Sequence, residues 1–170
     1  VVGSHFFPTE EMLQDRFALG QRYYAANDHD NSVQIFNEIE KTPNYALLDV
    51  DRIEVTIGDL VLPIRVAATY QLGNSNRNVG RTLLERSRNA AAEGDSLVAS
   101  RRWDEAQTSF NASKSFYRQL VDRQEGVPEH LQVMASYQIV RASYQMEDYP
   151  AVVRDAEEIL RRFPGSEYHE

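Results

Sequence analysis

Two stretches of this chain repeat one pattern of apolar residues, and that repetition restricts the possible folds more than any other feature. In each stretch, apolar residues recur at every third or fourth position on both sides of a short polar segment. Such spacing places the apolar side chains on one face of a helix. The sequence therefore predicts two helical hairpins, over residues 9–42 and 129–163. They align without a gap, so that Leu19, Gly20, Tyr23, Tyr24, Ser32, Phe36 and Ile39 fall on Ile139, Val140, Ser143, Tyr144, Val152, Ala156 and Ile159.

Turn-forming and helix-breaking residues mark the limits of both hairpins. Thr9 is a candidate N-cap for the first helix, and the acidic residues after it suit the positive end of a helix dipole. Residues 27–31 and 147–150 are polar and rich in turn formers, so each is the expected turn of its hairpin. Pro43 and Pro164 end the second helices, because proline has no amide donor and restricts the residue before it.

The middle of the chain carries two less regular copies of the pattern. The four copies begin 47, 27 and 46 residues apart. The short step leaves no room for a turn, so we expect one long helix from residue 80 to residue 102, with a kink at Gly94. The expected helices lie within 63–101 and over 103–124. The matching residues are Val66, Ala67, Tyr70, Val79 and Leu83 in one copy, and Gly94, Leu97, Ala106, Phe110 and Ser113 in the other.

The segment 45–62 has a different pattern of apolar residues from the helical stretches around it. Within it, apolar and polar residues alternate on both sides of Gly58-Asp59, a pair suited to a two-residue turn. The pattern predicts a short β-hairpin at about 52–63, with Ile57 opposite Leu60 and Val55 opposite Leu62. A helix over 45–57 remains the alternative.

Several of these residues resemble a known repeat. The pair Leu19-Gly20, followed by Tyr23, Ser32, Phe36 and Pro43, resembles the tetratricopeptide repeat, and Trp103-Asp104-Glu105-Ala106 with Phe110 is similar to its second half. The resemblance implies an all-α fold in which antiparallel helical hairpins stack as a right-handed superhelix. The whole of 1–170 would form one such domain. The spacing between copies departs from the family's 34-residue period, which puts regular stacking in the middle in question.

The chain's ending carries a narrower likeness. Phe163-Pro164-Gly165-Ser166 is similar to the aromatic-Pro-x-Ser ending of bacterial envelope members of the tetratricopeptide family. This likeness implies a place in the periplasm or at the periphery of the outer membrane, with the cytoplasm as the alternative. The preceding helix offers Val152, Val153, Ile159 and Leu160, more apolar residues than one stripe requires. We therefore expect another chain, or sequence beyond residue 170, to cover it.

Charge and composition narrow the possible partners. The net charge of −8 argues against nucleic acid, which requires a basic face. No apolar run approaches the length of a membrane span, so direct membrane insertion is not expected. Within 76–102 all the basic residues are arginines, which either dock an acidic partner or neutralise acidic parts of the same molecule. They are Arg77, Arg81, Arg86, Arg88, Arg101 and Arg102.

Motifs for catalysis, cofactors and metals are missing from the sequence. The chain has no cysteine, its four histidines are scattered, and it has no nucleophile elbow, phosphate loop or dinucleotide fingerprint. Residues 28–31 carry oxygen ligands in a row but lack the remainder of a calcium loop, so they suit a turn better. We expect no enzyme activity, no cofactor, no metal and no small-molecule substrate.

What remains is a surface for a protein partner. The resemblance implies a concave groove that binds a partner segment, and carrying the family's groove positions over identifies Gln21, Tyr24, Gln71, Tyr137, Arg141, Tyr144 and Gln145. The alternative for Tyr137 and Tyr144 is that both are core residues whose hydroxyls reach the surface. The expected function is a protein-interaction scaffold. The rival is a permanent structural subunit of a larger assembly, including a membrane-associated one.

Overall fold

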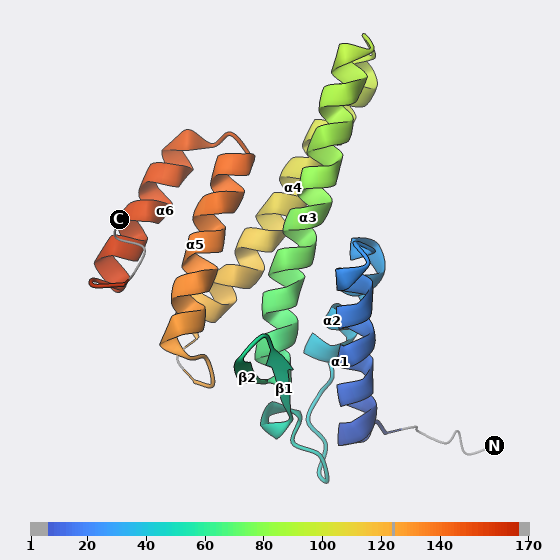
Figure 1. The fold of residues 1–170 in the computed structure, drawn as a ribbon, viewed down its shortest axis with the longest axis vertical. Helices are drawn as coiled ribbons and strands as arrows, with labels where there is room; N and C mark the ends of the chain where they lie inside the picture. Colours follow the sequence, from blue (N-terminus) through green and yellow to red (C-terminus); the bar gives the residue numbers. More distant parts are fainter. Residues whose placement is uncertain (1–6, 124, 167–170) are drawn as a thin grey trace, which may run out of the picture.

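The computed structural model describes residues 7–123 and 125–166, and over these residues the chain is predominantly helical (Figure 1). Six helices and one two-stranded sheet lie in this part, and each helix packs against the next along the chain. The helices are α1 (Glu10–Ala25), α2 (His29–Glu40), α3 (Ile64–Ala92), α4 (Ser96–Asp122), α5 (Glu129–Gln145) and α6 (Tyr149–Arg162).

The turns between α1 and α2, between α3 and α4, and between α5 and α6 are built alike. Each contains one residue in the left-handed region, and the aspartate after it caps the second helix by accepting a hydrogen bond from a backbone N–H three residues on. Both hairpins predicted near the chain's ends are thereby confirmed, and their turns correspond residue for residue. The left-handed residues, with their φ angles, are Asn27 (58°), Gly94 (83°) and Glu147 (60°).

The prediction of one helix from 80 to 102 is wrong. α3 ends at Ala92 and α4 begins at Ser96, so Gly94 lies in a full reversal of the chain. Glycine adopts its φ of 83° without a Cβ penalty, and Asp95 accepts from the backbone N–H of Val98. The middle of the chain is therefore one hairpin of two long helices, whose turn end extends beyond both flanking hairpins (Figure 1).

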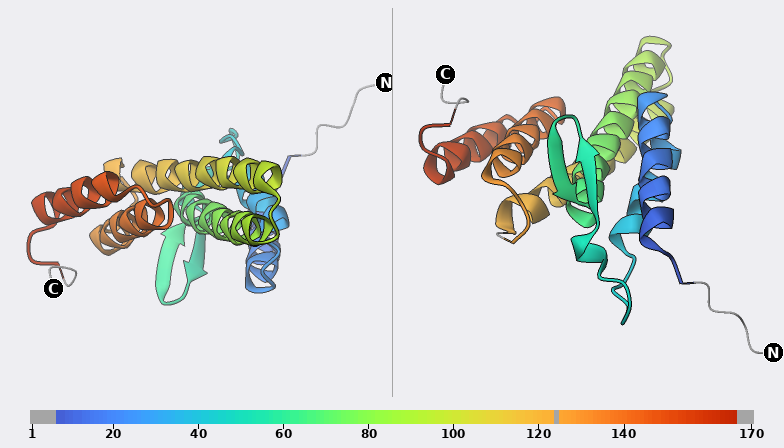
Figure 2. Two further views of the ribbon diagram at one scale, coloured as in Figure 1. Left: turned by 90° about the horizontal axis from the view of Figure 1, so that it is seen from above. Right: turned by 60° about the horizontal axis from the view of Figure 1, so that its bottom comes forward.

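The predicted β-hairpin is confirmed. β1 (Glu54–Ile57) and β2 (Leu60–Pro63) are antiparallel, with Ile57 opposite Leu60 and Val55 opposite Leu62. Gly58 supplies the positive φ of the turn, at 57°. The helical alternative over 45–57 is wrong, since that segment holds only the short 3-10 helix Val50–Arg52 before β1. The β-hairpin contacts α3 and projects from its foot on the side away from α4 (Figure 2).

Small residues let the helices of each pair approach closely. A Cβ added at Gly20 would lie 2.8 Å from the Phe36 ring. On α3 the heptad pair Gly73 and Gly80 receives the rings of Tyr117 and Phe110 from α4, and added Cβ atoms would lie 2.5 Å and 2.9 Å from them. In the first hairpin, Gly20 and Phe36, two residues of the repeated pattern, are thus in direct contact.

Candidate functional site

A cleft of about 830 Å³ lies between the turn ends of the first and last hairpins, across the face of α3. Three segments far apart in the sequence line it. The first hairpin contributes Tyr24, Asn27 and His29; the last contributes Tyr144, Gln145, Glu147 and Tyr149; and α3 contributes Arg77, Asn78, Arg81, Thr82, Leu84, Glu85 and Arg88.

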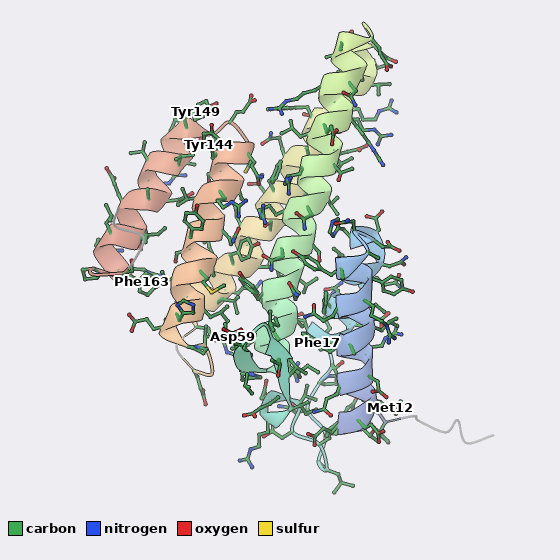
Figure 3. The ribbon with its side chains drawn as sticks, viewed as in Figure 1. Met12, Phe17, Asp59, Tyr144, Tyr149 and Phe163 are labelled. Atoms are coloured by element: carbon green, nitrogen blue, oxygen red, sulfur yellow. The ribbon has the colours of Figure 1, made fainter. Side chains whose placement is uncertain are left out.

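Two matching aromatic pairs flank the cleft. Tyr24 meets His29 edge to face, with ring centroids 5.6 Å apart, and Tyr144 meets Tyr149 in the same way at 6.1 Å. The pairs occupy equivalent positions because the two hairpin turns have the same geometry. Figure 3 shows Tyr144 and Tyr149 together at the turn end of α5 and α6, with Phe163 at the opposite end of α6. Paired rings of this kind offer flat apolar surface with polar groups at its edges, namely the tyrosine hydroxyls and the imidazole nitrogens.

Three arginines of α3 face the cleft. Their spacing of four and seven residues puts Arg77, Arg81 and Arg88 on one side of the helix. Arg81 lies 3.5 Å from the Asn78 amide oxygen, and Arg88 makes an ion pair of 3.2 Å with Glu147 across the cleft. The arginines outnumber the two glutamates of the lining, so this cleft is basic on a protein whose net charge is −8.

Arg77 is the deepest of the three. Only 7% of it is exposed, and within the described ranges its Nε and Nη1 atoms have no hydrogen-bond partner. Its guanidinium does hydrogen-bond to the hydroxyl of Tyr117. Burial raises the pKa of the Tyr117 phenol, and the charge of Arg77 acts in the opposite direction. A buried cation without full hydrogen bonding is costly, and these two buried nitrogens of Arg77 carry that cost in the free protein.

His29 couples the first hairpin to the arginines. Burial lowers the pKa of its imidazole, Asp30 and Asp28 act against that shift, and Arg81 reinforces it. Its Nδ1 atom is buried and has no hydrogen-bond partner among the residues described. The ring is therefore held toward its neutral form at the edge of the cleft.

The structure brings three of the seven predicted groove residues into this cleft. Tyr24, Tyr144 and Gln145 line it, and the Gln145 amide oxygen is buried with no partner in the described part of the chain. Tyr144 is 63% exposed and Tyr137 is 40% exposed, so the alternative that placed both in the core is wrong. Arg141, like Tyr137, lies exposed on α5 away from the cleft lining.

The two remaining groove residues hold helices together. Gln71 is 4% exposed and donates to the amide oxygen of Gln21 at 2.5 Å, which joins α3 to α1. Its own oxygen accepts from Asn74 at 2.9 Å, and Asn74 accepts from the Tyr117 hydroxyl at 2.5 Å. These contacts form a buried polar chain between α1, α3 and α4, because each amide satisfies the next.

Sequence reasoning missed the arginines, His29, Glu147 and Tyr149 as parts of one site. The available signal was the row of arginines at helical spacing, which fits either a docking site for an acidic partner or neutralisation of acidic parts of the same molecule.

Comparison of the chain with protein-family models, with curated proteins and with solved structures gave no match. In the described part of the chain, no helix is long and apolar enough to cross a membrane, and no cluster of acidic or histidine side chains is arranged to hold a metal.

Proposed function

We propose that this protein is a non-catalytic interaction module that binds a segment of a protein partner in the cleft across α3. Its hairpins would stack as in a tetratricopeptide superhelix, with the cleft as the concave groove. The successive packing of helices and the shared turn geometry support this arrangement.

The cleft's lining is the observation that carries the proposal. Aromatic pairs on both sides, three arginines of α3, and an amide oxygen of Gln145 that has no partner among the described residues combine apolar surface with donors and acceptors. Tyrosine and arginine, together with tryptophan, are enriched among the residues that contribute most binding energy at protein interfaces. A cleft of about 830 Å³ has room for several residues of an extended peptide.

The test is selection of peptides from a random display library, followed by binding to two matched variants. Thr82 is an exposed residue of α3 in the cleft, so Thr82→Trp should obstruct it. Thr108→Trp places the same ring on an exposed position of α4 that does not line the cleft. We expect selected peptides to bind the wild type and Thr108→Trp equally, and Thr82→Trp at least about tenfold more weakly. Equal binding to both variants would contradict the proposal.

A permanent structural subunit is the second candidate, because α6 presents apolar side chains to solvent. Val153 is 58% exposed and Leu160 is 46% exposed, one heptad apart on the same helix. Exposed apolar patches mark interaction surfaces when they are contiguous. Sedimentation at tens of micromolar separates the candidates: a stable monomer fits the reversible module, and self-association abolished by Val153→Ser and Leu160→Ser fits the subunit.

A further inference from the structure

The cleft holds a cation that the protein itself leaves incompletely bonded. Arg77 is more than nine-tenths buried, it lines the cleft, and its Nε and Nη1 atoms find no acceptor among the described residues. Guanidinium groups form their strongest hydrogen bonds with carboxylates, which match their forked geometry. These two nitrogens of Arg77 are themselves buried, so an acceptor from a ligand reaches them only when the guanidinium turns toward the cleft, and it would then complete the hydrogen bonds that the fold leaves unmade.

Glu147 already supplies one such carboxylate inside the cleft. It pairs with Arg88 at 3.2 Å, and both side chains are substantially exposed, at 46% and 65%. Exposed pairs of this kind contribute little to stability, so an incoming carboxylate can replace this one at small cost.

The backbone at Glu147 is unusual for this residue type. Its φ of 60° lies in the left-handed region, where the equivalent turn residues are Asn27 and Gly94. Asparagine and glycine favour that region, whereas a glutamate does not. The third turn thus carries a less suitable residue, and that residue's carboxylate reaches an arginine of the cleft.

We propose that the partner segment is acidic, and that its carboxylates pair with Arg77 and Arg81 and displace Glu147 from Arg88. Glu147 is then an internal competitor for the ligand. This inference rests on the proposed function and specifies its partner. Nucleic acid is the poorer polyanion for this cleft, because its closely spaced phosphates require a continuous basic face, whereas Glu85 and Glu147 interrupt the three arginines here and the whole chain carries −8. The same net charge repels an acidic peptide from other surfaces, which makes its binding site-selective.

The probe is a fluorescein-labelled octapeptide of alternating glutamate and glycine, matched by one with glutamine in place of glutamate. Fluorescence anisotropy should show that the wild type binds the glutamate peptide at least about tenfold more tightly than the glutamine peptide. The binding should weaken as salt is raised. Equal binding of the two peptides, no binding of the glutamate peptide, or tighter binding of a single-stranded oligonucleotide of equal charge would overturn the proposal.

Variants assign the effect to the cleft. Arg77→Met and Arg81→Gln should each weaken binding of the glutamate peptide about fivefold or more, whereas Arg101→Gln, an exposed residue outside the cleft, should not. Glu147→Asn should strengthen binding, because it removes the competitor and suits the left-handed backbone. If Arg101→Gln weakens binding as much as Arg81→Gln, or if Glu147→Asn weakens it, the proposal fails.

The melting temperature distinguishes a binding role for Arg77 from a structural one. A residue kept for a ligand lowers stability in the free protein, so Arg77→Met should melt at the wild-type temperature or above it. A lower melting temperature would make Arg77 structural and overturn its role here.

If library peptides occupy the cleft but are neutral or basic, this inference fails while the proposed function stands. If no peptide of any charge binds there, the proposed function fails as well.

Discussion

At the scale of single residues, burial rather than residue type distinguishes the side chains that give the cleft its chemistry. Arg77 and Arg101 belong to the same arginine-rich segment, yet Arg77 is 7% exposed and Arg101 lies open to solvent. Gln71 and Gln145 likewise differ in their hydrogen bonding. The Gln71 amide donates to Gln21 on α1 and accepts from Asn74 on α3, whereas the buried oxygen of Gln145 has no partner in the described residues. The cleft's chemistry therefore comes from groups that the packing leaves with unused hydrogen bonds.

His29 should make stability depend on pH in a predictable direction. Burial lowers its pKa below the ordinary value of 6.5, so the unfolded chain binds the proton more readily than the folded one. Stability should therefore fall as the pH drops through 6.5 towards the folded-state pKa. Urea unfolding at neutral and at mildly acidic pH should show a smaller loss for His29→Gln than for the wild type. His130→Gln, at an exposed histidine of α5, is the control, and equal losses in the two variants would refute the assignment.

Gly80 tests the close approach of the two long helices. A Cβ at this position would lie 2.9 Å from the Phe110 ring, so Gly80→Ala should destabilise the protein by about 1 to 3 kcal/mol, although alanine favours helix. Asn89→Ala, an exposed change on the same helix, should be neutral or slightly stabilising. In a Phe110→Leu background the cost of Gly80→Ala should shrink. A cost that persists in full would mean that the ring is not its cause.

At the scale of secondary-structure elements, local chemistry decided how much could be predicted. The β-hairpin followed from Gly58 and its alternating neighbours, and the outer hairpins followed from polar turns between apolar stripes. The turn at Gly94 was missed, although Glu93-Gly94-Asp95-Ser96 is polar, because the 27-residue step between copies of the pattern argues against a turn and residues 90–92 are alanines, which favour helix. One glycine with a capping aspartate was sufficient to reverse the chain there.

α6 is held to the rest of the molecule by a buried ion pair. The Asp155 carboxylate lies 3.3 Å from the ammonium of Lys114 on α4, and it also accepts from the Ser143 hydroxyl of α5 at 2.7 Å. Both charged side chains are at most 10% exposed. This arrangement joins three helices at one carboxylate, so loss of the carboxylate should destabilise mainly the packing of α6.

Asp155→Asn should therefore destabilise the protein by about 3 to 5 kcal/mol, because it leaves Lys114 buried without its countercharge. Hydrogen exchange should show protection lost first over residues 149–162. Glu157→Gln makes the same chemical change at an exposed position of α6 and should leave exchange unaltered. Unchanged protection of α6 in Asp155→Asn would refute this account of how the last helix is anchored.

At the scale of the whole molecule, the cleft exists only because three hairpins meet. Tyr24 and Tyr144 could be chosen from the sequence, since they occupy equivalent positions in the repeated pattern. The burial of Arg77 could not be predicted from the sequence, because it depends on tertiary packing around α3 that no local pattern indicates. Pairing of Gln21 with Gln71 across 50 positions of sequence was likewise beyond local reasoning.

The central claim is that a partner segment lies in the cleft, and its most direct test is a hydrogen-exchange footprint. Exchange is measured for the isolated protein with and without a saturating peptide selected from the display library. The account predicts added protection at 24–29, 77–88 and 144–149, the three segments that line the cleft, and little change at 150–162. Protection confined to α6, or to the β-hairpin at 54–63, would contradict it.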